Sequence, residues 1–294
     1  TGADLGFTFR TFEAAAEPEE LLQQEVRFNG VKAKLTGEVQ LPIVEARTSM
    51  AVPVALTLTE RFRYRDGGPG ERPGIRILRF EPVDGDPTLP SGTLDVEEST
   101  GRILVERSER RDLPGIVKSE QRILRYGEPA PGHWRLLEAR TFERWVTSRG
   151  VSQVQRHLVY TDLRINAEGF ERRRAEARAS DATMLRQTVE GLRYYTRRSD
   201  GTRVLEAKPK TSGRALAGVL LMDPGLNPPV IPLGGLAYFD FNAFDRGIQL
   251  NALTAVVFNQ ASLAIPNVGA GFDLGLRTSA LFLPTTERPV RNGG

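Results

Sequence analysis

The chain has 294 residues and no cysteine, which excludes disulfide frameworks, thiol nucleophiles and metal sites built on thiolates. This absence does not fix a compartment, because exported β-proteins and many cytosolic proteins both lack cysteine. The sequence also has no run of about 18 or more apolar residues, so it contains no candidate transmembrane helix. The mean hydropathy of -0.32 agrees with that reading.

Residues that commonly carry chemistry are scarce. The only two histidines, His133 and His157, lie in different strand-like runs and lack the spacing of a metal pair. No nucleophile elbow, phosphate loop or dinucleotide fingerprint appears, and the glycines at 234–235 and 269–271 are typical of turns. Aromatic residues make up 7% of the chain and form no platform for nucleic acid. We therefore predict no catalytic residue, metal or cofactor site, and no nucleic-acid partner.

The charged residues follow a strand-like arrangement. The net charge is +3, which an arginine-rich composition explains, although a basic patch facing anionic lipid or nucleic acid is the alternative. Glu138 and Glu143 alternate with Arg140 and Arg144. We expect these four to form cross-strand charge ladders on a solvated face.

Residues 1–170 are a succession of alternating, strand-like runs. Val52, Val54, Leu56 and Leu58 alternate with small or polar residues, and Phe62 and Tyr64 continue the phase. Such period-two alternation indicates half-buried strands. A hairpin is expected around residues 98–101, and further strands at Ile116–Tyr126, Trp134–Val146 and Val151–Ile165. A short helix is expected at Glu17–Val26, where Pro18 suits the first turn. The zone predicts an antiparallel β-domain, built as a meander, a sandwich or a half-barrel.

Residues 171–215 form a polar zone with 12 Lys or Arg and 6 Asp or Glu. Glu171–Ala179 has helical propensity, and Gly191–Ala207 is typical of a hairpin that turns at residues 199–201. We interpret the zone as a basic linker with a short helix and a hairpin. The alternative is a segment that lies near anionic lipid headgroups or a partner.

Residues 216–294 change character abruptly, with only six charged residues between 216 and 284. Two 11-residue runs, Ile248–Phe258 and Phe272–Phe282, pair an apolar face with a polar or small one, as strands of a membrane barrel do. The residues predicted to face the membrane are Ile248, Leu250, Val256, Phe258, Phe272, Leu274, Leu276 and Phe282. Aromatic residues at 238, 239, 241 and 244 precede the first run, where an interfacial girdle would lie. A soluble β-sandwich is the alternative.

Two stretches resemble known families. Leu158–Asn166, followed by Phe170, is similar to the closing strand of the lipoprotein-sorting carrier fold of Gram-negative periplasms, a curved antiparallel half-barrel. The stretch Pro232–Phe241, leading into Ile248–Phe258, looks like the opening of an outer-membrane barrel of the surface-antigen or barrel-assembly type. Two strands cannot close a barrel, since small ones need about 8. The start at Thr1 and the end at Gly294 suggest a segment of a longer protein.

The carrier resemblance implies a ligand. In that family the concave apolar face holds acyl chains, and the corresponding candidates here are Val52, Val54, Leu56, Leu58, Phe62 and Leu158. The alternative is that these side chains form a dry core. The barrel resemblance implies outer-membrane lipid as a partner, with a lipoprotein or acyl chain at the periplasmic domain.

The sequence thus predicts a mainly β protein, with an antiparallel curved sheet or half-barrel followed by the first strands of an outer-membrane barrel. We expect a non-enzymatic bacterial envelope protein, located in the outer membrane with a periplasmic domain that binds a lipid, a lipoprotein or a partner strand. A soluble β-rich interaction module without membrane contact is the main alternative. A hydrolase using Asp or Glu carboxylates ranks last.

Overall fold

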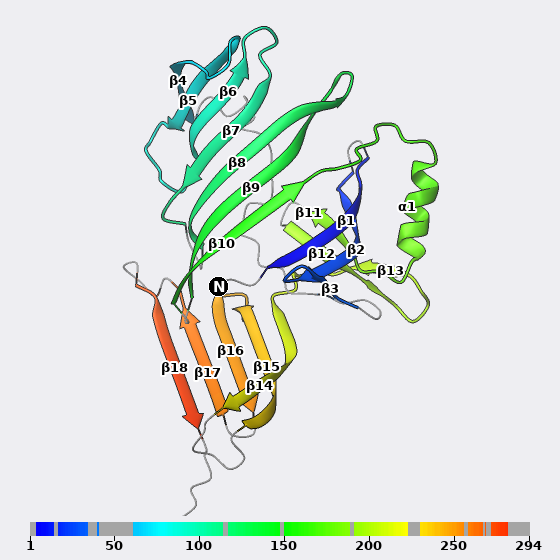
Figure 1. Ribbon diagram of the computed structural model, residues 1–294, viewed down its shortest axis with the longest axis vertical. Helices are drawn as coiled ribbons and strands as arrows, with labels where there is room; N and C mark the ends of the chain where they lie inside the picture. Colours follow the sequence, from blue (N-terminus) through cyan, green and yellow to red (C-terminus); the bar gives the residue numbers. More distant parts are fainter. Residues whose placement is uncertain are drawn as a thin grey trace, which may run out of the picture. The chain divides into compact units, whose positions relative to one another are not determined.

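The computed structural model describes residues 4–14, 17–34, 40, 61–113, 117–147, 150–188, 191–222, 230–255, 258–266, 268 and 272–281. It is mainly β, with three antiparallel sheets and one short helix (Figure 1). Within these residues no sheet closes on itself. The mainly antiparallel β class is therefore confirmed. The chain divides into two compact units, Thr1–Lys210 and Thr211–Gly294.

The first unit contains a six-stranded sheet built from both ends of that unit. Its strands follow the order β1-β2-β11-β12-β13, with β3 paired to β2. Their bounds are β1 Leu5–Phe12, β2 Glu20–Phe28, β3 Val31–Lys32, β11 Met184–Thr188, β12 Gly191–Arg197 and β13 Arg203–Leu205. Helix α1, Phe170–Ala179, precedes β11. Because β11 pairs with β2, residues far apart in the sequence share one sheet.

The polar zone 171–215 supplies structural elements to both units. The predicted helix and hairpin are confirmed as α1 and as β12–β13, which turns at Gly201 with a φ of 83°. These elements, together with β11, belong to the first unit, and Thr211–Ala215 belong to the second. The zone therefore contains β11 and the first residues of β14 in addition to the predicted helix and hairpin.

The helix predicted at Glu17–Val26 is wrong, because the structure has strand β2 from Glu20 to Phe28. The segment pairs with β1 on one side and with β11 on the other, and both pairings are antiparallel. Helix propensity is a weak preference that tertiary pairing overrides.

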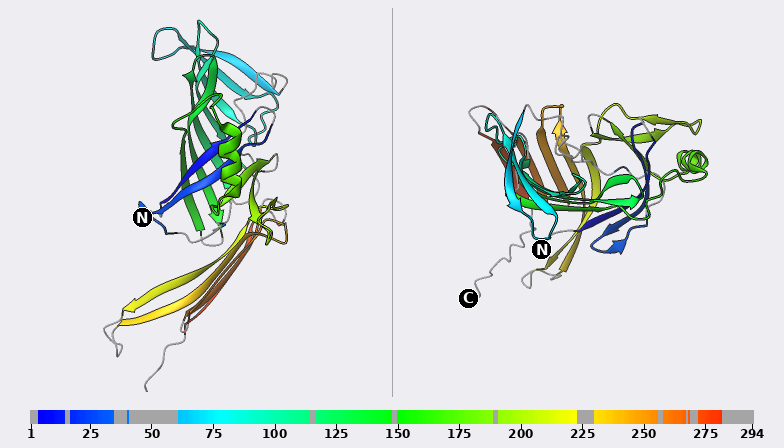
Figure 2. Two further views of the ribbon diagram at one scale, coloured as in Figure 1. Left: turned by 90° about the vertical axis from the view of Figure 1, so that its right-hand side faces the viewer. Right: turned by 90° about the horizontal axis from the view of Figure 1, so that it is seen from above.

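The first unit also contains a seven-stranded antiparallel meander in the order β10-β9-β8-β7-β6-β5-β4. Figure 2 shows these strands as a bent sheet. Their bounds are β4 Phe62–Pro69, β5 Ile75–Pro82, β6 Ser91–Glu97, β7 Ile103–Arg110, β8 Val117–Ala130, β9 His133–Thr147 and β10 Gly150–Val159. The hairpin predicted around 98–101 is confirmed as β6–β7, where Gly101 has a φ of 70°. The three runs expected between 116 and 165 correspond to β8, β9 and β10, but β10 ends at Val159. The strand expected to continue to Ile165, and the closing strand expected at Leu158–Asn166, are therefore wrong beyond Val159.

One face of this sheet holds the apolar core of the meander. Phe62, Phe80 and Leu94 are at most 5% exposed, and their rings and side chains pack together. We call this the core face. The pairing Leu78–Leu94–Glu106–Leu124–Ala139–Leu158 continues it across the sheet, because directly opposite residues share a face.

The second unit is a five-stranded antiparallel meander, ordered β14-β15-β16-β17-β18. Its bounds are β14 Ser212–Met222, β15 Val230–Ala243, β16 Ile248–Ala255, β17 Phe258–Ile265 and β18 Leu274–Leu281. The run expected as one strand at Ile248–Phe258 is divided between β16 and β17. The run expected at Phe272–Phe282 corresponds to β18.

Among the described residues, no helix has both the length and the apolar character needed to cross a bilayer.

Candidate membrane-facing surface

The register of the five-stranded sheet sorts its side chains into two faces with different chemistry. The apolar face is defined here by residues that lie opposite one another across strands. Its members with described side chains are Ser212, Arg214, Leu216, Met222, Leu236, Tyr238, Asp240, Ile248, Leu250, Ala252, Thr254, Asn259, Ala261, Leu263, Ile265, Leu274, Leu276, Thr278 and Ala280. Most of these side chains are aliphatic. They share a face because successive side chains of a strand point to opposite sides of the sheet.

The opposite side, called here the polar face, carries small and polar residues. It includes Gly213, Ala215, Gly235, Ala237, Phe239, Gln249, Asn251, Leu253, Ala255, Phe258, Gln260, Ser262, Ala264, Gly275, Arg277 and Ser279. Arg277 lies beside Gln260. With the Gln260 amide oriented so that its oxygen faces the guanidinium, Arg277 donates hydrogen bonds at 3.0 and 3.2 Å.

In this sheet the aliphatic side chains are exposed and several polar side chains are buried, which is the reverse of the arrangement that water favours. Leu216 is 87% exposed and Leu276 is 65% exposed, both on the apolar face. On the polar face Gln249 is 2% exposed and Ser262 is 5% exposed. Water-soluble sheets bury their aliphatic face and expose their polar face. A contiguous exposed apolar surface marks contact with a partner or with lipid.

The structure places six of the eight predicted membrane-facing residues. Ile248, Leu250, Leu274 and Leu276 share the apolar face. Phe272 precedes β18 and is exposed. Phe258 is the first residue of β17, pairs with Leu281 and lies on the polar face, because the pairing of Thr254 with Asn259 puts odd-numbered residues of β17 on the apolar face. Val256 and Phe282 lie outside the described residues.

Sequence reasoning missed three leucines of the apolar face, namely Leu216, Leu236 and Leu263. Alternation around Leu216 and Leu236 is broken by glycine and proline, which hides the period in β14 and β15. The low number of charged residues in the zone is the only sequence signal that points to an apolar surface in β14 and β15.

The aromatic cluster expected to form a girdle is divided between the two faces. Tyr238 lies on the apolar face, whereas Phe239 and Phe241 lie on the other face with ring centroids 5.4 Å apart. Phe244 occupies the β15–β16 turn with a φ of 61° and is 78% exposed.

The predicted acyl-binding residues are only partly described. Val52, Val54, Leu56 and Leu58 lie outside the described residues. Phe62 and Leu158 share the core face of the seven-stranded sheet, in its two edge strands. Phe62 is packed against Phe80, whose ring centroid is 6.1 Å away, and Leu158 lies opposite Ala139.

Away from that aromatic cluster, the core face is charged. Glu120 is 3% exposed and accepts hydrogen bonds from Arg110 at 2.7 Å. Arg122 lies 2.6 Å from the same carboxylate. The core face is therefore apolar at the β4–β6 end, whereas along β7–β10 it carries buried carboxylates beside Leu124, Ala139 and Leu158.

The predicted ladder of carboxylates and arginines in β9 is divided between the two faces. On the exposed side Glu138 makes the expected cross-strand contacts, with Arg125 of β8 at 3.4 Å and His157 of β10 at 2.8 Å. Its contact with Arg140 at 2.8 Å lies within β9. The expectation fails for Glu143, which is buried on the core face and accepts a hydrogen bond of 2.6 Å from the Trp145 indole nitrogen. Because positions five apart point to opposite faces of a strand, their parity already separates the two carboxylates.

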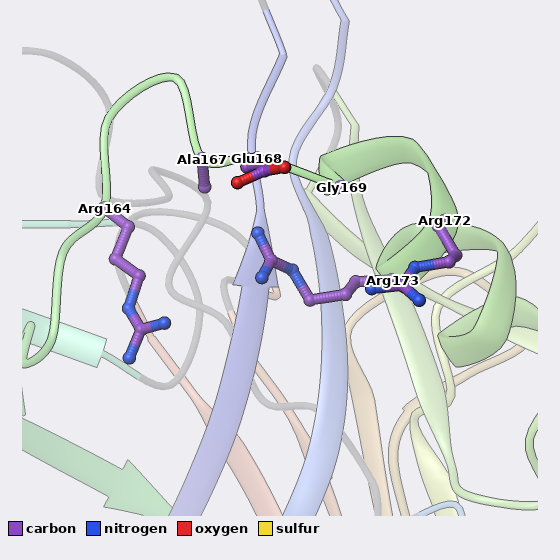
Figure 3. Close-up of a pocket in the computed structure, with 6 residues that line it drawn as sticks. All are labelled: Arg164, Ala167, Glu168, Gly169, Arg172 and Arg173. Atoms are coloured by element: carbon purple, nitrogen blue, oxygen red, sulfur yellow. The ribbon is translucent and has the colours of Figure 1, made fainter.

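A hollow of about 750 Å³ lies beside the first turn of α1 (Figure 3). It is lined by Arg164, Ala167, Glu168, Gly169, Arg172 and Arg173. Figure 3 shows Arg173 extending toward Glu168, while Arg164 turns away from it. Arg164 pairs with Asp162 at 3.1 Å and Arg172 lies 4.0 Å from Glu176, so both are partly neutralised at the surface.

Among the described residues, no group of three or more His, Asp or Glu is placed to hold a metal ion. Comparison with known proteins adds no further assignment, because no protein-family model, no curated protein and no solved structure matches the chain. The surface with the clearest chemical signature is therefore the apolar face of the five-stranded sheet.

Proposed function

We propose that the chain is part of a non-enzymatic bacterial envelope protein whose five-stranded sheet lies in the outer membrane. In this proposal the apolar face contacts lipid and the polar face lines the interior of a barrel. The seven-stranded sheet of the first unit is then a periplasmic half-barrel.

A single observation supports this proposal most strongly. Aliphatic side chains such as Leu216 and Leu276 are exposed, whereas Gln249 and Ser262 on the other face are buried. In water, each exposed leucine would forgo about 1.5–3 kcal/mol of burial free energy. Hydrocarbon removes that cost, and a membrane barrel has this same division between a lipid face and a polar interior.

The proposal also places a requirement on the sheet edges. β14 and β18 are the edge strands of the described sheet, and lipid offers no hydrogen-bond partner to unpaired backbone groups. Additional strands must therefore pair with both edges, and about 8 strands form the smallest membrane barrels.

The first unit would act in the periplasm by binding a lipid, a lipoprotein or a partner strand. An acyl chain would bind at the β4–β6 end of the core face, where it would have to open the buried cluster of Phe62, Phe80 and Leu94. The part of β7–β10 around Glu120 is unsuited to an acyl chain, because hydrocarbon offers no hydrogen bond to the carboxylate or to the guanidinium groups of Arg110 and Arg122.

The lipid contact can be tested by flotation. The full chain would be diluted from urea into phosphatidylcholine vesicles and separated on a density gradient. We expect it to float with the vesicles and to resist extraction by alkaline carbonate. Leu276→Arg places a charge on the apolar face, which costs about 2–4 kcal/mol near the bilayer midplane, so it should lower the floated fraction.

Gly275→Arg is the matched control, since it adds the same charge at the neighbouring position on the polar face. A Cβ at Gly275 meets no atom within 4 Å, so the side chain can be accommodated. This variant should float like the parent chain. A parent chain that remains monomeric in buffer and ignores vesicles would contradict the proposal and favour a soluble interaction module. Equal behaviour of the two variants would contradict the assignment of the faces.

A further inference from the structure

The apolar face of the five-stranded sheet is not uniformly apolar, and its polar residues follow a pattern. One row of directly opposed residues, called row A, runs across all five strands. It consists of Ser212, Asp240, Leu250, Leu263 and Leu276. Row A is polar in β14 and β15 and aliphatic in β16, β17 and β18.

A second row lies four residues further along each strand and has the opposite pattern. Row B consists of Leu216, Leu236, Thr254, Asn259 and Ala280. It is aliphatic in β14 and β15 and polar in β16 and β17, where the Thr254 hydroxyl donates a hydrogen bond of 2.6 Å to Asn259. The aliphatic band therefore crosses the sheet diagonally.

The slope of this band follows from the dimensions of a sheet. The leucines lie in row B in β14 and β15 but in row A in β17 and β18. Along the strand direction this shift is four residues, or about 14 Å at a rise of ~3.4 Å per residue. Across the sheet the same step covers three strand spacings of ~4.8 Å, also about 14 Å. The band is therefore inclined to the strands by about 45°, close to the tilt of membrane strands.

We infer that this diagonal band marks the bilayer, and that the strands cross it with this inclination. The inference rests on the proposed function and adds the depth of individual residues. Leu216, Leu263 and Leu276 lie deep in the hydrocarbon. Ser212 and Arg214 lie nearer to one headgroup layer, and Asn259 lies nearer to the opposite one.

The positions of charged and aromatic residues agree with this assignment of depth. Arg214 lies opposite Tyr238 in the register, and Asp240 lies at the same corner of the sheet. Arginine and tyrosine are both common at membrane interfaces. Phe244, in the turn after β15, lies beyond that corner on the same side. A band parallel to the rows would instead put Asp240 at the same depth as Leu276.

The depth assignment can be tested with single cysteines, because the chain has none of its own. The variants are Ser212→Cys and Leu276→Cys in row A, and Leu216→Cys and Asn259→Cys in row B. Each is labelled with an environment-sensitive fluorophore in vesicles that carry nitroxide lipids, with the quencher either shallow or deep in the acyl chain. Ser279→Cys reports on the polar face.

We expect the deep nitroxide to quench labels at 276 and 216 more than the shallow one does. The order should reverse at 212 and 259, although each pair shares a row. Equal ratios within a row would overturn the inclined band while leaving lipid contact intact. No quenching at any of the four positions would overturn the proposed function itself. Circular dichroism checks folding, and Leu236→Cys replaces the Leu216 variant if its spectrum departs from the parent.

Discussion

The Tyr195 hydroxyl donates a hydrogen bond of 2.8 Å to the Glu20 carboxylate, although 175 positions separate the two residues. Arg178 and Arg174 bind the same carboxylate at 2.6 and 3.1 Å. Glu20 is fully buried between helix α1 and the six-stranded sheet. The start of the first unit is thus joined to its last strands through one side chain.

Replacing this carboxylate should destabilise the first unit strongly. Glu20→Gln keeps the shape but removes the buried carboxylate charge that Arg174 and Arg178 share, which leaves Arg174 paired only with Glu17 and Glu171 at the edge of the site. Breaking a buried ion pair costs about 3–5 kcal/mol. We expect the urea midpoint of unfolding, followed by tryptophan fluorescence, to fall accordingly. Glu171→Gln is the control, because Glu171 is exposed and 3.9 Å from the same arginine. A loss below that of the control would contradict a structural role for Glu20.

The same residue should make the first unit sensitive to acid. Burial alone would raise the pKa of Glu20, but hydrogen bonds from Arg178, Tyr195 and Arg174 outweigh burial and hold the pKa below 4.5. A carboxyl with a depressed pKa stabilises the fold above its unfolded pKa, and the contribution is lost as pH falls through the folded value.

The acid prediction is tested by comparing urea midpoints at pH 7 and near pH 4. The parent should lose more stability over this interval than Glu20→Gln. Glu19 acts in the opposite sense, because burial and the nearby Glu13 raise its pKa, so its protonation favours the fold. Glu19→Gln should therefore increase the loss on acidification. Identical pH dependence in the parent and in Glu20→Gln would refute the assignment.

The carbonyl end of α1 offers a separate test. The Arg203 guanidinium donates hydrogen bonds to the carbonyls of Arg178, Ser180 and Ala182 at 2.8, 2.7 and 2.7 Å. A cation at the C-terminus of a helix also complements its dipole. Arg203→Ala should lower the free energy of unfolding by about 1–2 kcal/mol. Arg203→Lys should recover only part of it, because an ammonium cannot reach three carbonyls in fixed geometry.

Local patterns predicted the long strands of the meander well. The turn at Gly101 and the runs that became β8 and β9 stand out because period-two alternation and breakers are properties of the sequence itself. The local helix propensity of Glu17–Val26 predicts a helix, but it takes no account of the pairing with β1 and β11 that makes this segment strand β2. The pairing of β2 with β11 joins residues more than 150 positions apart, and no local pattern encodes it.

The candidate surface was predictable in part, because alternation within one strand can be read from the sequence. Alternation identified Leu274 and Leu276, which the register places on one face with Ile248 and Leu250. Alternation along a single strand predicts the same face for Phe258, but the antiparallel pairing of Thr254 with Asn259 places Phe258 on the opposite face. The diagonal arrangement of rows A and B depends on the register of five strands, which the sequence alone does not reveal.

The two carboxylates of β9 give a direct test of face assignment. Glu143 is buried, bonded to the Trp145 indole and 3.3 Å from Arg156, whereas Glu138 lies on the exposed face. Glu143→Gln should lower the free energy of unfolding by about 2–3 kcal/mol and shift Trp145 emission. Glu138→Gln should cost less than about 1 kcal/mol. Trp134→Phe in both backgrounds isolates the Trp145 signal, and equal effects would contradict the assigned faces.

Leucines in the two units should respond oppositely to the same truncation, because their surroundings differ. Leu94 is 1% exposed within the aromatic cluster of the meander, so Leu94→Ala should cost about 2–5 kcal/mol by leaving a cavity. Leu236→Ala removes a side chain that is 59% exposed and leaves no internal cavity. In buffer this change should be neutral or favourable, whereas in vesicles it should weaken insertion by about 1–3 kcal/mol through lost apolar contact with lipid. Urea midpoints of the first unit and the vesicle-bound fraction measure the two effects. A Leu236→Ala chain that loses stability in buffer, with no change in vesicle binding, would show that protein rather than lipid covers this face.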